Sequence, residues 1–281
     1  MGALFALCGT FKMAAPMAKI FPSVQFPLPT NGSDEKDSEY EFRNAVFMIQ
    51  SPLKSRRCLL TGKHGSGKTS LLFQCAVSCA LDGQKVVFIS HRRFQSMPLS
   101  VHGAPSPDPL LMKHIHILYY QDRPSLLQYL AGIHSVPSPP DVILVDDIDF
   151  YATHPKTQDT GSTTALLCAY LIDAGAFIDT HRANNQTRGR ENDQRCQLIA
   201  SVTTPSSGEV ALEHVYQSFL PTFLRISGVQ GTNEVYQLSL HPNGTSQATC
   251  IITYEIRDSI RLLDYHVGDA ALGLSQDFTQ E

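Results

Sequence analysis

The sequence predicts an α/β fold, with a mainly parallel sheet, helices on both faces and a C-terminal β-hairpin. Three features of the 281-residue chain point to this fold class. Short apolar runs alternate with segments of helical periodicity, glycines fill one junction between a strand and a helix, and a Pro-Asn-Gly turn separates two alternating segments near the end. A hydrophobic content of 42% is ample for a core of this size.

Each element follows from a local pattern. Short apolar runs flanked by turn formers predict strands, and apolar residues at every third or fourth position predict helices. Gly83 supplies the stop signal of the first helix. In chain order the pattern predicts a strand at 57–61, a helix at 69–81, strands at 85–90 and 115–120, a helix at 124–134, a strand at 142–146, a helix at 163–180, a strand at 196–203 and a helix at 209–219.

The last part of the chain changes character. Residues 234–241 and 249–257 alternate between apolar and polar side chains, and they flank Pro242-Asn243-Gly244. Asn-Gly between alternating segments is a strong hairpin signal. We therefore expect a β-hairpin appended to the sheet.

The two ends differ from the middle. Turn formers and acidic residues dominate 27–41, so we expect 1–41 to be a flexible N-terminal extension with an acidic linker, 42–265 the folded domain and 266–281 a flexible tail. Residues 1–24 are apolar and free of acid, but Pro16 breaks the run and no arginine precedes Arg43, which argues against a signal or transit peptide. Met13 or Met17 are alternative start sites.

Composition excludes several classes of protein. The net charge of −4 gives no overall basic character, so any nucleic-acid surface must be a local patch. The seven scattered cysteines include no C-x-x-C pair, which indicates reduced intracellular thiols; Cys75 and Cys79 lie four apart, a spacing open to a metal or redox pair but favouring simple packing. Charged residues or proline interrupt every apolar run, so we expect no membrane contact.

The strongest motif is a phosphate-binding loop between the strand at 57–61 and the helix at 69–81. It matches G-x-x-x-x-G-K-[ST], and its expected nucleotide-binding residues are Gly62, Lys63, His64, Gly65, Ser66, Gly67, Lys68, Thr69 and Ser70. Glycines allow the backbone amides to surround phosphates, Lys68 would reach the β- and γ-phosphates, and Thr69 would bind Mg²⁺. A glycine turn that merely joins strand and helix is the alternative.

A buried strand at 142–146 ends in acids, which supplies the carboxylate that a magnesium site needs. We assign Asp146 to Mg²⁺ together with Thr69, and ATP as the nucleotide. Asp147 is the first candidate for general base, alongside Lys68 as a catalytic residue, and Asp122 is the second; with neither, hydrolysis would be slow. The separation of Lys68 from Asp146 leaves room for two strands, which favours an ATPase over a GTPase. A nucleotide kinase is a further alternative, although no arginine-rich lid is present.

Three blocks resemble the RecA/Rad-type recombinase ATPases. They are LLTGKHGSGKTSLLFQCA, VVFISHRRFQSMP at 86–98 and VILVDDIDFY at 142–151. The run RRFQSMP is more narrowly similar to the SWIM-domain-associated ATPases of the metazoan Shu complex, a group of recombinase paralogues. The resemblance covers about residues 56–227 and implies a RecA-like P-loop ATPase core.

What the resemblance implies is a nuclear protein that hydrolyses ATP, binds single-stranded DNA and a SWIM-type zinc-finger protein, and assists the Rad-type recombinase and its paralogues in homologous-recombination repair of double-strand breaks. The chain departs from the family pattern where recombinases carry a glutamate and a glutamine. Gln121-Asp122 and Thr203-Thr204-Pro205 stand there, and the following DNA-binding loop is shortened to Ser206-Ser207-Gly208. These departures favour an accessory role.

Two groups of arginines are candidates for DNA contact. Basic residues with Asn and Gln between them could contact phosphates, although a solvated polar insertion and ordinary strand-end charges are the alternatives. The candidates are Arg92 and Arg93 after the second strand, and Arg182, Arg188, Arg190 and Arg195 in the segment 181–195.

Recombinases grip one another through a Phe-x-x-Ala element, and two such tetrapeptides occur. Phe42 begins one ahead of the core, and Phe73 begins the other in the phosphate-loop helix, where a core role is favoured. Two other functions stay open: a scaffold that binds ATP with negligible turnover, and a small-molecule phosphotransferase.

Overall fold

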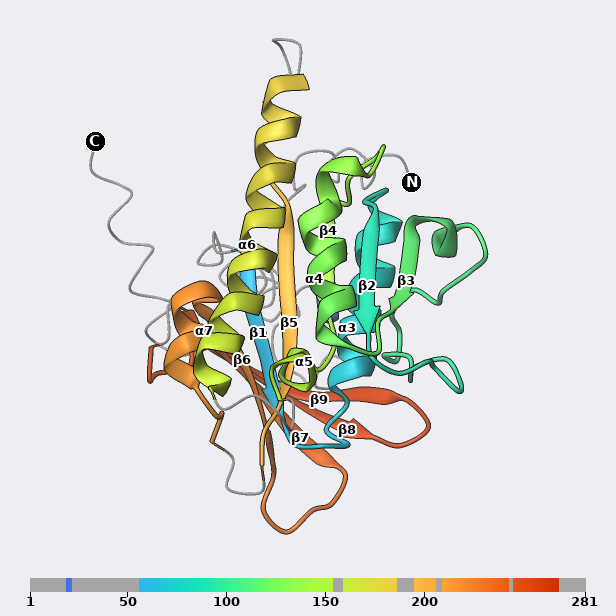
Figure 1. The fold of residues 1–281 in the computed structure, drawn as a ribbon. Coiled ribbons are helices and arrows are strands. Elements are labelled where there is room, and N and C mark those ends of the chain that lie inside the picture. Colours follow the sequence, from blue (N-terminus) through green and yellow to red (C-terminus); the bar gives the residue numbers. More distant parts are fainter. Residues whose placement is uncertain are drawn as a thin grey trace, which may run out of the picture.

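The computed structural model describes residues 19–21, 56–153, 159–185, 195–205, 209–242 and 245–267 (Figure 1). Several predictions lie outside these residues: the linker at 27–41, the Phe42 motif, Arg188 and Arg190, the loop Ser206-Ser207-Gly208 and the tail beyond 267. The described strands form one nine-stranded sheet in the order β3-β2-β4-β5-β1-β6-β7-β8-β9. The α/β fold class is therefore confirmed.

The elements of the parallel part of the sheet match the predicted ones closely, apart from α5 and β6, which were not predicted. Its strands and the helices between them are β1 (Arg57–Gly62), α3 (Lys68–Leu81), β2 (Val86–Ser90), β3 (Ile115–Tyr119), α4 (Arg123–Ala131), β4 (Val142–Val145), α5 (Ile148–Ala152), α6 (Thr160–Asn185), β5 (Gln197–Thr203), α7 (Glu213–Phe219) and β6 (Thr222–Gly228). Short 3₁₀ turns at Leu111–His114 and Gly132–Ser135 precede β3 and follow α4. The strand β5 lies between β1 and β4, so the phosphate-loop strand and the strand that precedes Asp146 are not neighbours.

The C-terminal part is larger than the predicted hairpin. Strands β7 (Val235–His241) and β8 (Cys250–Ile256) pair antiparallel as expected, but β7 also pairs with β6 and β8 with β9 (Ile260–Val267). Neither β6 nor β9 was predicted. The sequence of β6 contains Arg225, which an isolated strand pattern does not favour; in the fold its guanidinium pairs with Glu213 of α7 at 2.6 Å. The antiparallel strands extend across the lower part of the molecule in Figure 1.

Alternating strand residues divide the core into two layers. Cys58 and Leu60 of β1 face the cluster around α3, whereas Leu59 faces the cluster formed with α4, α5, α6 and α7. Successive side chains of a strand point to opposite faces, so both faces of the sheet must be covered by helices. Figure 1 shows α4, α6 and α7 in front of the sheet and α3 behind it.

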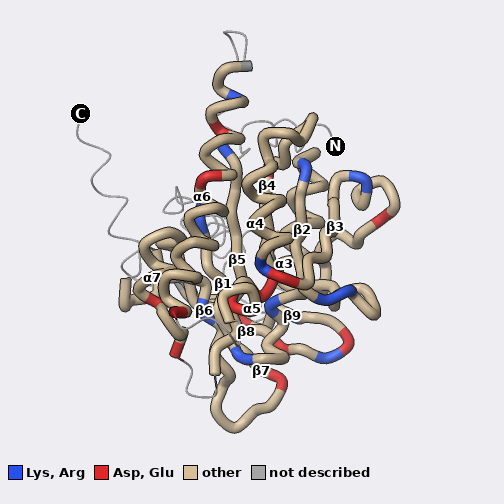
Figure 2. The backbone as a smooth tube through the Cα atoms, viewed as in Figure 1, with Lys and Arg blue, Asp and Glu red and all other residues tan. Residues whose placement is uncertain are grey.

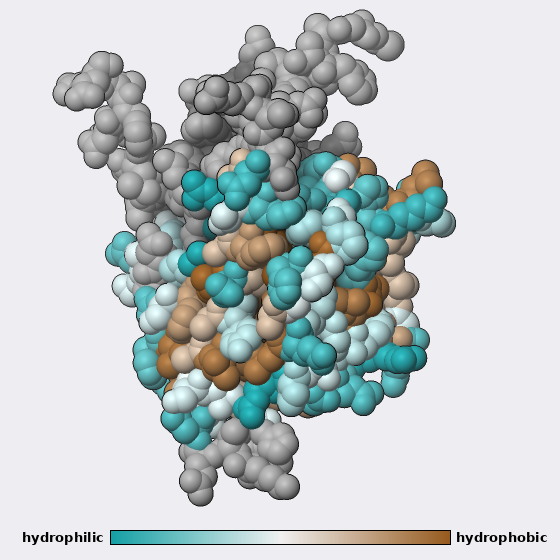
Figure 3. Space-filling view, turned by 45° about the horizontal axis from the view of Figure 1, so that its top comes forward, coloured by the Kyte–Doolittle hydropathy of each residue, from teal (hydrophilic) through white to brown (hydrophobic). Residues whose placement is uncertain are grey.

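By length and composition alone, the helix α6 could cross a membrane, although the sequence pattern predicts no membrane contact. In the fold it packs on the sheet. Its buried residues recur at helical spacing: Leu167, Leu171, Ala174 and Ile178. Figure 3 shows apolar and polar side chains interspersed over one face of the molecule.

The cysteines and the second Phe-x-x-Ala motif belong to the core. The six cysteines among the described residues are buried, including Cys75 and Cys79 on α3. Phe73 is 3% exposed and makes edge-on ring contacts with Phe88 and Phe94. The packing interpretation of Cys75, Cys79 and Phe73 therefore fits the structure.

Candidate nucleotide-binding site

The phosphate loop joins β1 to α3 at the carboxyl edge of the parallel strands. Gly67 has a φ of 85°, and a Cβ added there would lie 3.0 Å from Cδ1 of Ile256 on β8, so both the backbone and the neighbouring strand require glycine. The amides at the start of α3 carry the positive end of the helix. The loop therefore has the backbone geometry of an anion site.

The side chain of Lys68 folds back onto the phosphate loop. Its ammonium donates to the carbonyl oxygens of Gly62 at 3.1 Å and Lys63 at 3.2 Å. Burial lowers the pKa of Lys68, and the carboxylates of Asp147, Asp146 and Asp149 oppose that shift. A buried cation beside three acids is held in place by charge and by carbonyl oxygens, and it is available to exchange those oxygens for phosphate oxygens.

The other predicted residues of the loop divide into two groups. Lys63, His64 and Gly65 are exposed at its tip, whereas Ser66 and Ser70 are buried. The hydroxyl of Ser70 accepts a hydrogen bond from the backbone N–H of Leu99 at 3.1 Å. Ser70 thus ties α3 to the segment after β2, a role that sequence reasoning missed.

Asp146 is the centre of the acidic part of the site. Its carboxylate accepts hydrogen bonds from the hydroxyls of Thr69 and Ser201, each at 2.7 Å. Burial raises the pKa of Asp146 to about 6, the charge of Asp147 adds to the rise, and the hydrogen bonds from Ser201 and Thr69 oppose it. The predicted partners of Mg²⁺, Thr69 and Asp146, are thus in contact.

Asp147 follows in the left-handed backbone region, with a φ of 51°, an uncommon conformation for a residue that is not glycine. Its N–H donates to the hydroxyl of Ser201 at 2.8 Å, and its carboxylate accepts from the hydroxyl of Thr203 at 2.9 Å. Asp149, two residues further along the chain, accepts a hydrogen bond from the N–H of Thr203 at 3.4 Å. Burial together with the charge of Asp147 raises the pKa of Asp149 to about 6. The end of β5 therefore holds the acids that follow β4.

Asp122, the second candidate for general base, is the N-cap of α4. Its carboxylate accepts from the backbone N–H of Ser125 at 2.8 Å, and this hydrogen bond lowers its pKa. It follows β3, which lies at the edge of the sheet, four strands from β1. The acids whose charges act on the pKa of Lys68 are Asp147, Asp146 and Asp149, so Asp147 stays the first candidate for general base and Asp122 the second.

The oxygen atoms of this site suit Mg²⁺. The hydroxyl of Thr69 and the carboxylate of Asp146 are hard ligands. Burial raises the pKa values of Asp146 and Asp149, and a bound cation would offset that cost. Within the described ranges, no group of three or more His, Cys, Asp or Glu side chains forms a metal site. Bound Mg²⁺ would therefore depend on Thr69, Asp146, waters and the nucleotide's own phosphates.

Ser201 and Thr203 are the functional residues that sequence reasoning missed. Both lie on β5, and they link Asp146 and Asp147 by the contacts described above. A signal was present: alternate residues of a strand share a face, so Ser201 and Thr203 lie on one face of β5, whose other face carries only apolar residues. Their distance in sequence from Asp146 hid the contact.

The structure separates the arginines predicted to bind DNA. Arg92 and Arg93 follow β2, at the carboxyl ends of the parallel strands, where the phosphate loop also lies. Arg92 donates to His91 at 2.6 Å, and the guanidinium of Arg93 lies over the ring of Tyr119. Arg182 and Arg195 lie at the opposite edge, where α6 ends and β5 begins. Figure 2 shows basic and acidic residues interspersed along the described chain.

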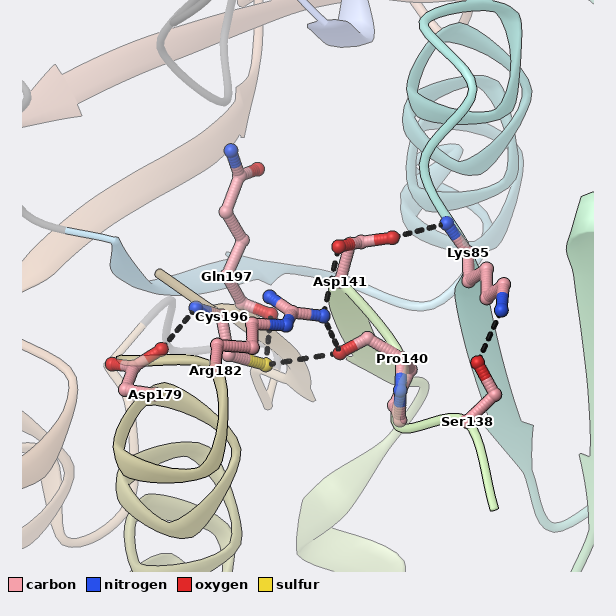
Figure 4. A network of polar contacts seen from close by, with 8 residues as sticks. All are labelled: Lys85, Ser138, Pro140, Asp141, Asp179, Arg182, Cys196 and Gln197. Atoms are coloured by element: carbon pink, nitrogen blue, oxygen red, sulfur yellow. Dashed lines mark hydrogen bonds and ion pairs between the residues drawn. The ribbon is translucent and has the colours of Figure 1, made fainter. Parts of the chain in front are cut away.

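Arg182 belongs to a structural network (Figure 4). Its guanidinium forms an ion pair with Asp141 at 2.8 Å and donates to the carbonyl of Pro140, and Asp141 also accepts from the N–H of Lys85 at 2.6 Å. These contacts tie the end of α6 to the starts of β4 and β2. The prediction that Arg182 contacts DNA phosphate is therefore corrected to a structural role.

Replacing Arg182 with alanine is expected to lower the free energy of unfolding by about 1–2 kcal/mol, because Asp141 and the Pro140 carbonyl lose a half-buried partner. Single-stranded DNA affinity and its salt dependence should stay unchanged. Thermal unfolding and salt titrations of DNA binding measure the two effects. A flatter salt dependence with unchanged stability would return Arg182 to the DNA surface.

Taken together, fold and site define a P-loop ATPase: a strand, phosphate loop and helix whose threonine contacts an acid at the end of a second parallel strand. The family model for the ATPase family associated with various cellular activities (AAA) matches residues 58–213, and the chain belongs to this family, so its core is a nucleotide-binding domain.

The chain is a homologue of ATPase SWSAP1. It is 33% identical to the protein of Homo sapiens over 169 residues, which cover 58% of this chain and 68% of the human protein. It is 31% identical to the protein of Mus musculus over 160 residues, or 56% of this chain and 52% of the mouse protein, so it spans about half of that relative. The crystal structure of the RadB recombinase matches 74% of this chain and 91% of its own, at 13% identity and a TM-score of 0.45.

Proposed function

We propose that this chain is an ATP-binding and hydrolysing recombinase paralogue that assists homologous-recombination repair of double-strand breaks as a nuclear subunit of a Shu-type complex. The observation that carries the proposal is the hydrogen bond between Thr69, at the start of α3 after the phosphate loop, and Asp146, directly after β4. Homology to ATPase SWSAP1 supports the class of complex.

In this proposal each residue of the site has a chemical role. Lys68 and the loop amides bind the β- and γ-phosphates, and Thr69 with Asp146 holds Mg²⁺, which neutralises phosphate charge when bound. Asp147 orients the attacking water, with Thr203 fixing the carboxylate. This geometry holds the reacting groups on rigid strand ends.

The proposed partners follow from the resemblance to the Shu complex. They are a SWIM-type zinc-finger protein, the Rad-type recombinase with its paralogues, and single-stranded DNA. Arg92 and Arg93 are the proposed DNA contacts beside the nucleotide site, because both lie at its edge of the sheet. Arg188, Arg190 and Arg195 are proposed for a second, separate contact.

A nucleotide-binding scaffold is the second candidate, and two contacts favour it. The carboxylate of Asp147 is engaged by Thr203, and that of Asp122 is engaged as a helix cap. An acid that accepts a hydrogen bond from the protein has less capacity to accept a proton from water. In a scaffold, nucleotide would bind tightly and turn over negligibly.

ATP turnover of the full chain, with and without single-stranded DNA, separates the two functions. An ATPase that acts on DNA should turn over faster with DNA, and the stimulation should be absent from Lys68→Ala. Turnover equal to that of Lys68→Ala in both conditions, with nucleotide still bound by the unaltered protein, would favour the scaffold. Phosphate transfer to a small molecule without DNA would contradict both.

A further inference from the structure

Three residues of the predicted flexible extension lie in the core of the ATPase domain. Lys19, Ile20 and Phe21, here called the N-terminal segment, are 7%, 0% and 7% exposed. Lys19 forms an ion pair with Asp82, which follows α3, and Ile20 and Phe21 belong to the apolar cluster on the α3 face. Residues 22–56 separate this segment from β1 in the sequence.

The N-terminal segment contacts the strand that supports the phosphate loop. The ring of Phe21 lies against the ring of Tyr254 on β8, with 5.9 Å between centroids, and Tyr236 of β7 stacks on Tyr254 at 5.8 Å. The Tyr254 hydroxyl donates to the backbone carbonyl of Ser66 at 2.8 Å. A chain of two contacts thus joins Phe21 to the phosphate loop.

The hydrogen bond from Tyr254 to the Ser66 carbonyl fixes a peptide group of the phosphate loop that would face a bound nucleotide. The Ser66 carbonyl and the Gly67 N–H belong to one planar peptide unit, so a donor that fixes the carbonyl also fixes the direction of that N–H. Amides at this point of a phosphate loop point at the bound phosphates. Burial raises the pKa of Tyr254 well above its ordinary value, so its hydroxyl keeps the proton that it donates.

We propose that the N-terminal segment positions the phosphate loop through Tyr254 and thereby sets the affinity for nucleotide. Phe21 and Tyr236 both contact the Tyr254 ring, so its orientation is restrained while both are present. With Phe21 removed, Tyr254 gains freedom, and the loop loses its fixed amide. Phe21 and Tyr254 are positioning residues in this proposal and do not touch the nucleotide.

The test compares full-length variants by their dissociation constants for a fluorescent ADP analogue. Tyr254→Phe removes the hydroxyl and keeps the ring, and we expect it to weaken binding about 10-fold, comparable to the loss of one good hydrogen bond. Phe21→Ala should weaken binding by a similar factor. The double variant should bind the ADP analogue at most about twofold more weakly than the single variant with the lower affinity, because both changes act on one contact. Tyr236→Phe is the matched control, since its hydroxyl contacts the distant carbonyl of Asn233, and it should change binding less than about twofold.

Hydrogen exchange of the nucleotide-free proteins gives a second readout at residues 62–69. Exchange there should be faster in Tyr254→Phe and Phe21→Ala and unchanged in Tyr236→Phe. Effects on ADP binding that multiply in the double variant would overturn the proposal. So would a lower melting temperature with unchanged ADP binding and loop exchange, which would leave the segment a purely stabilising role. If ATP turnover proves negligible, the proposed ATPase function fails, while ADP binding and loop exchange still decide this proposal.

Discussion

Replacing Lys68 with alanine should reduce ATP turnover at least 100-fold, to the background rate of hydrolysis, and should weaken nucleotide binding. In the folded protein its ammonium lies in a buried position between the loop carbonyls and three carboxylates. Charge that develops on the phosphates is stabilised most strongly by a fixed cation in a site of low dielectric, where removing one such group costs about 10²–10³ in rate. Alanine also removes the positive charge of Lys68, which lowers the pKa of Asp146.

Lys63→Ala is the matched control for Lys68→Ala. It removes an exposed lysine side chain from the tip of the same loop and leaves in place the backbone carbonyl of residue 63, which accepts from Lys68. Turnover should therefore stay within about twofold of the unaltered protein. Steady-state phosphate release and binding of a fluorescent nucleotide measure both effects. Comparable losses in the two variants would mean that total positive charge near the loop matters and that the position of Lys68 does not.

The parts of the site that a contiguous motif specifies could be predicted from the sequence. The glycines, Lys68 and Thr69 stand at fixed spacing between a strand and a helix, and Asp146 ends a buried apolar run. Each of these assignments depends on residues within a few positions of one another. Their agreement with the geometry reflects local backbone constraints that a single sequence carries.

Contacts between distant segments could not be predicted in the same way. Ser201 and Thr203 reach the acids after β4 because β5 lies beside β4, a consequence of strand order that no local pattern encodes. Phe21 and Tyr254 are in contact although most of the sequence separates them. The segment 181–195 looked like one basic loop, but Arg182 pairs with Asp141, because the end of α6 lies over the start of β4. Tertiary packing decides each of these cases.

Replacing Asp146 with asparagine should have opposite effects on turnover and on stability. Turnover should fall about 100-fold or more, because the proposed Mg²⁺ ligand loses its charge. The nucleotide-free protein in a metal chelator should become more stable at pH 7.5. The folded-state pKa of about 6 lies above the ordinary value of 3.8, so the folded protein holds a proton that the unfolded chain releases. Its stability therefore falls as the pH rises from about 4 to about 6 and stays lowered above that window.

Asparagine removes this penalty while it keeps the hydrogen bonds, since its amide oxygen can accept from Ser201 and its N–H can donate to the Thr69 hydroxyl. The gain should be on the order of 2 kcal/mol at pH 7.5, or a melting temperature higher by about 5 °C, and it should vanish near pH 4. Asp173→Asn, at an exposed acid on α6, is the control and should show no such change.

Magnesium with ADP should stabilise the unaltered protein more than the Asp146→Asn variant, because a bound cation offsets the cost of the buried carboxylate. If Asp146→Asn is less stable than the unaltered protein at pH 7.5, the buried charge of Asp146 does not destabilise the folded protein. That result would contradict the argument that this carboxylate needs a bound cation.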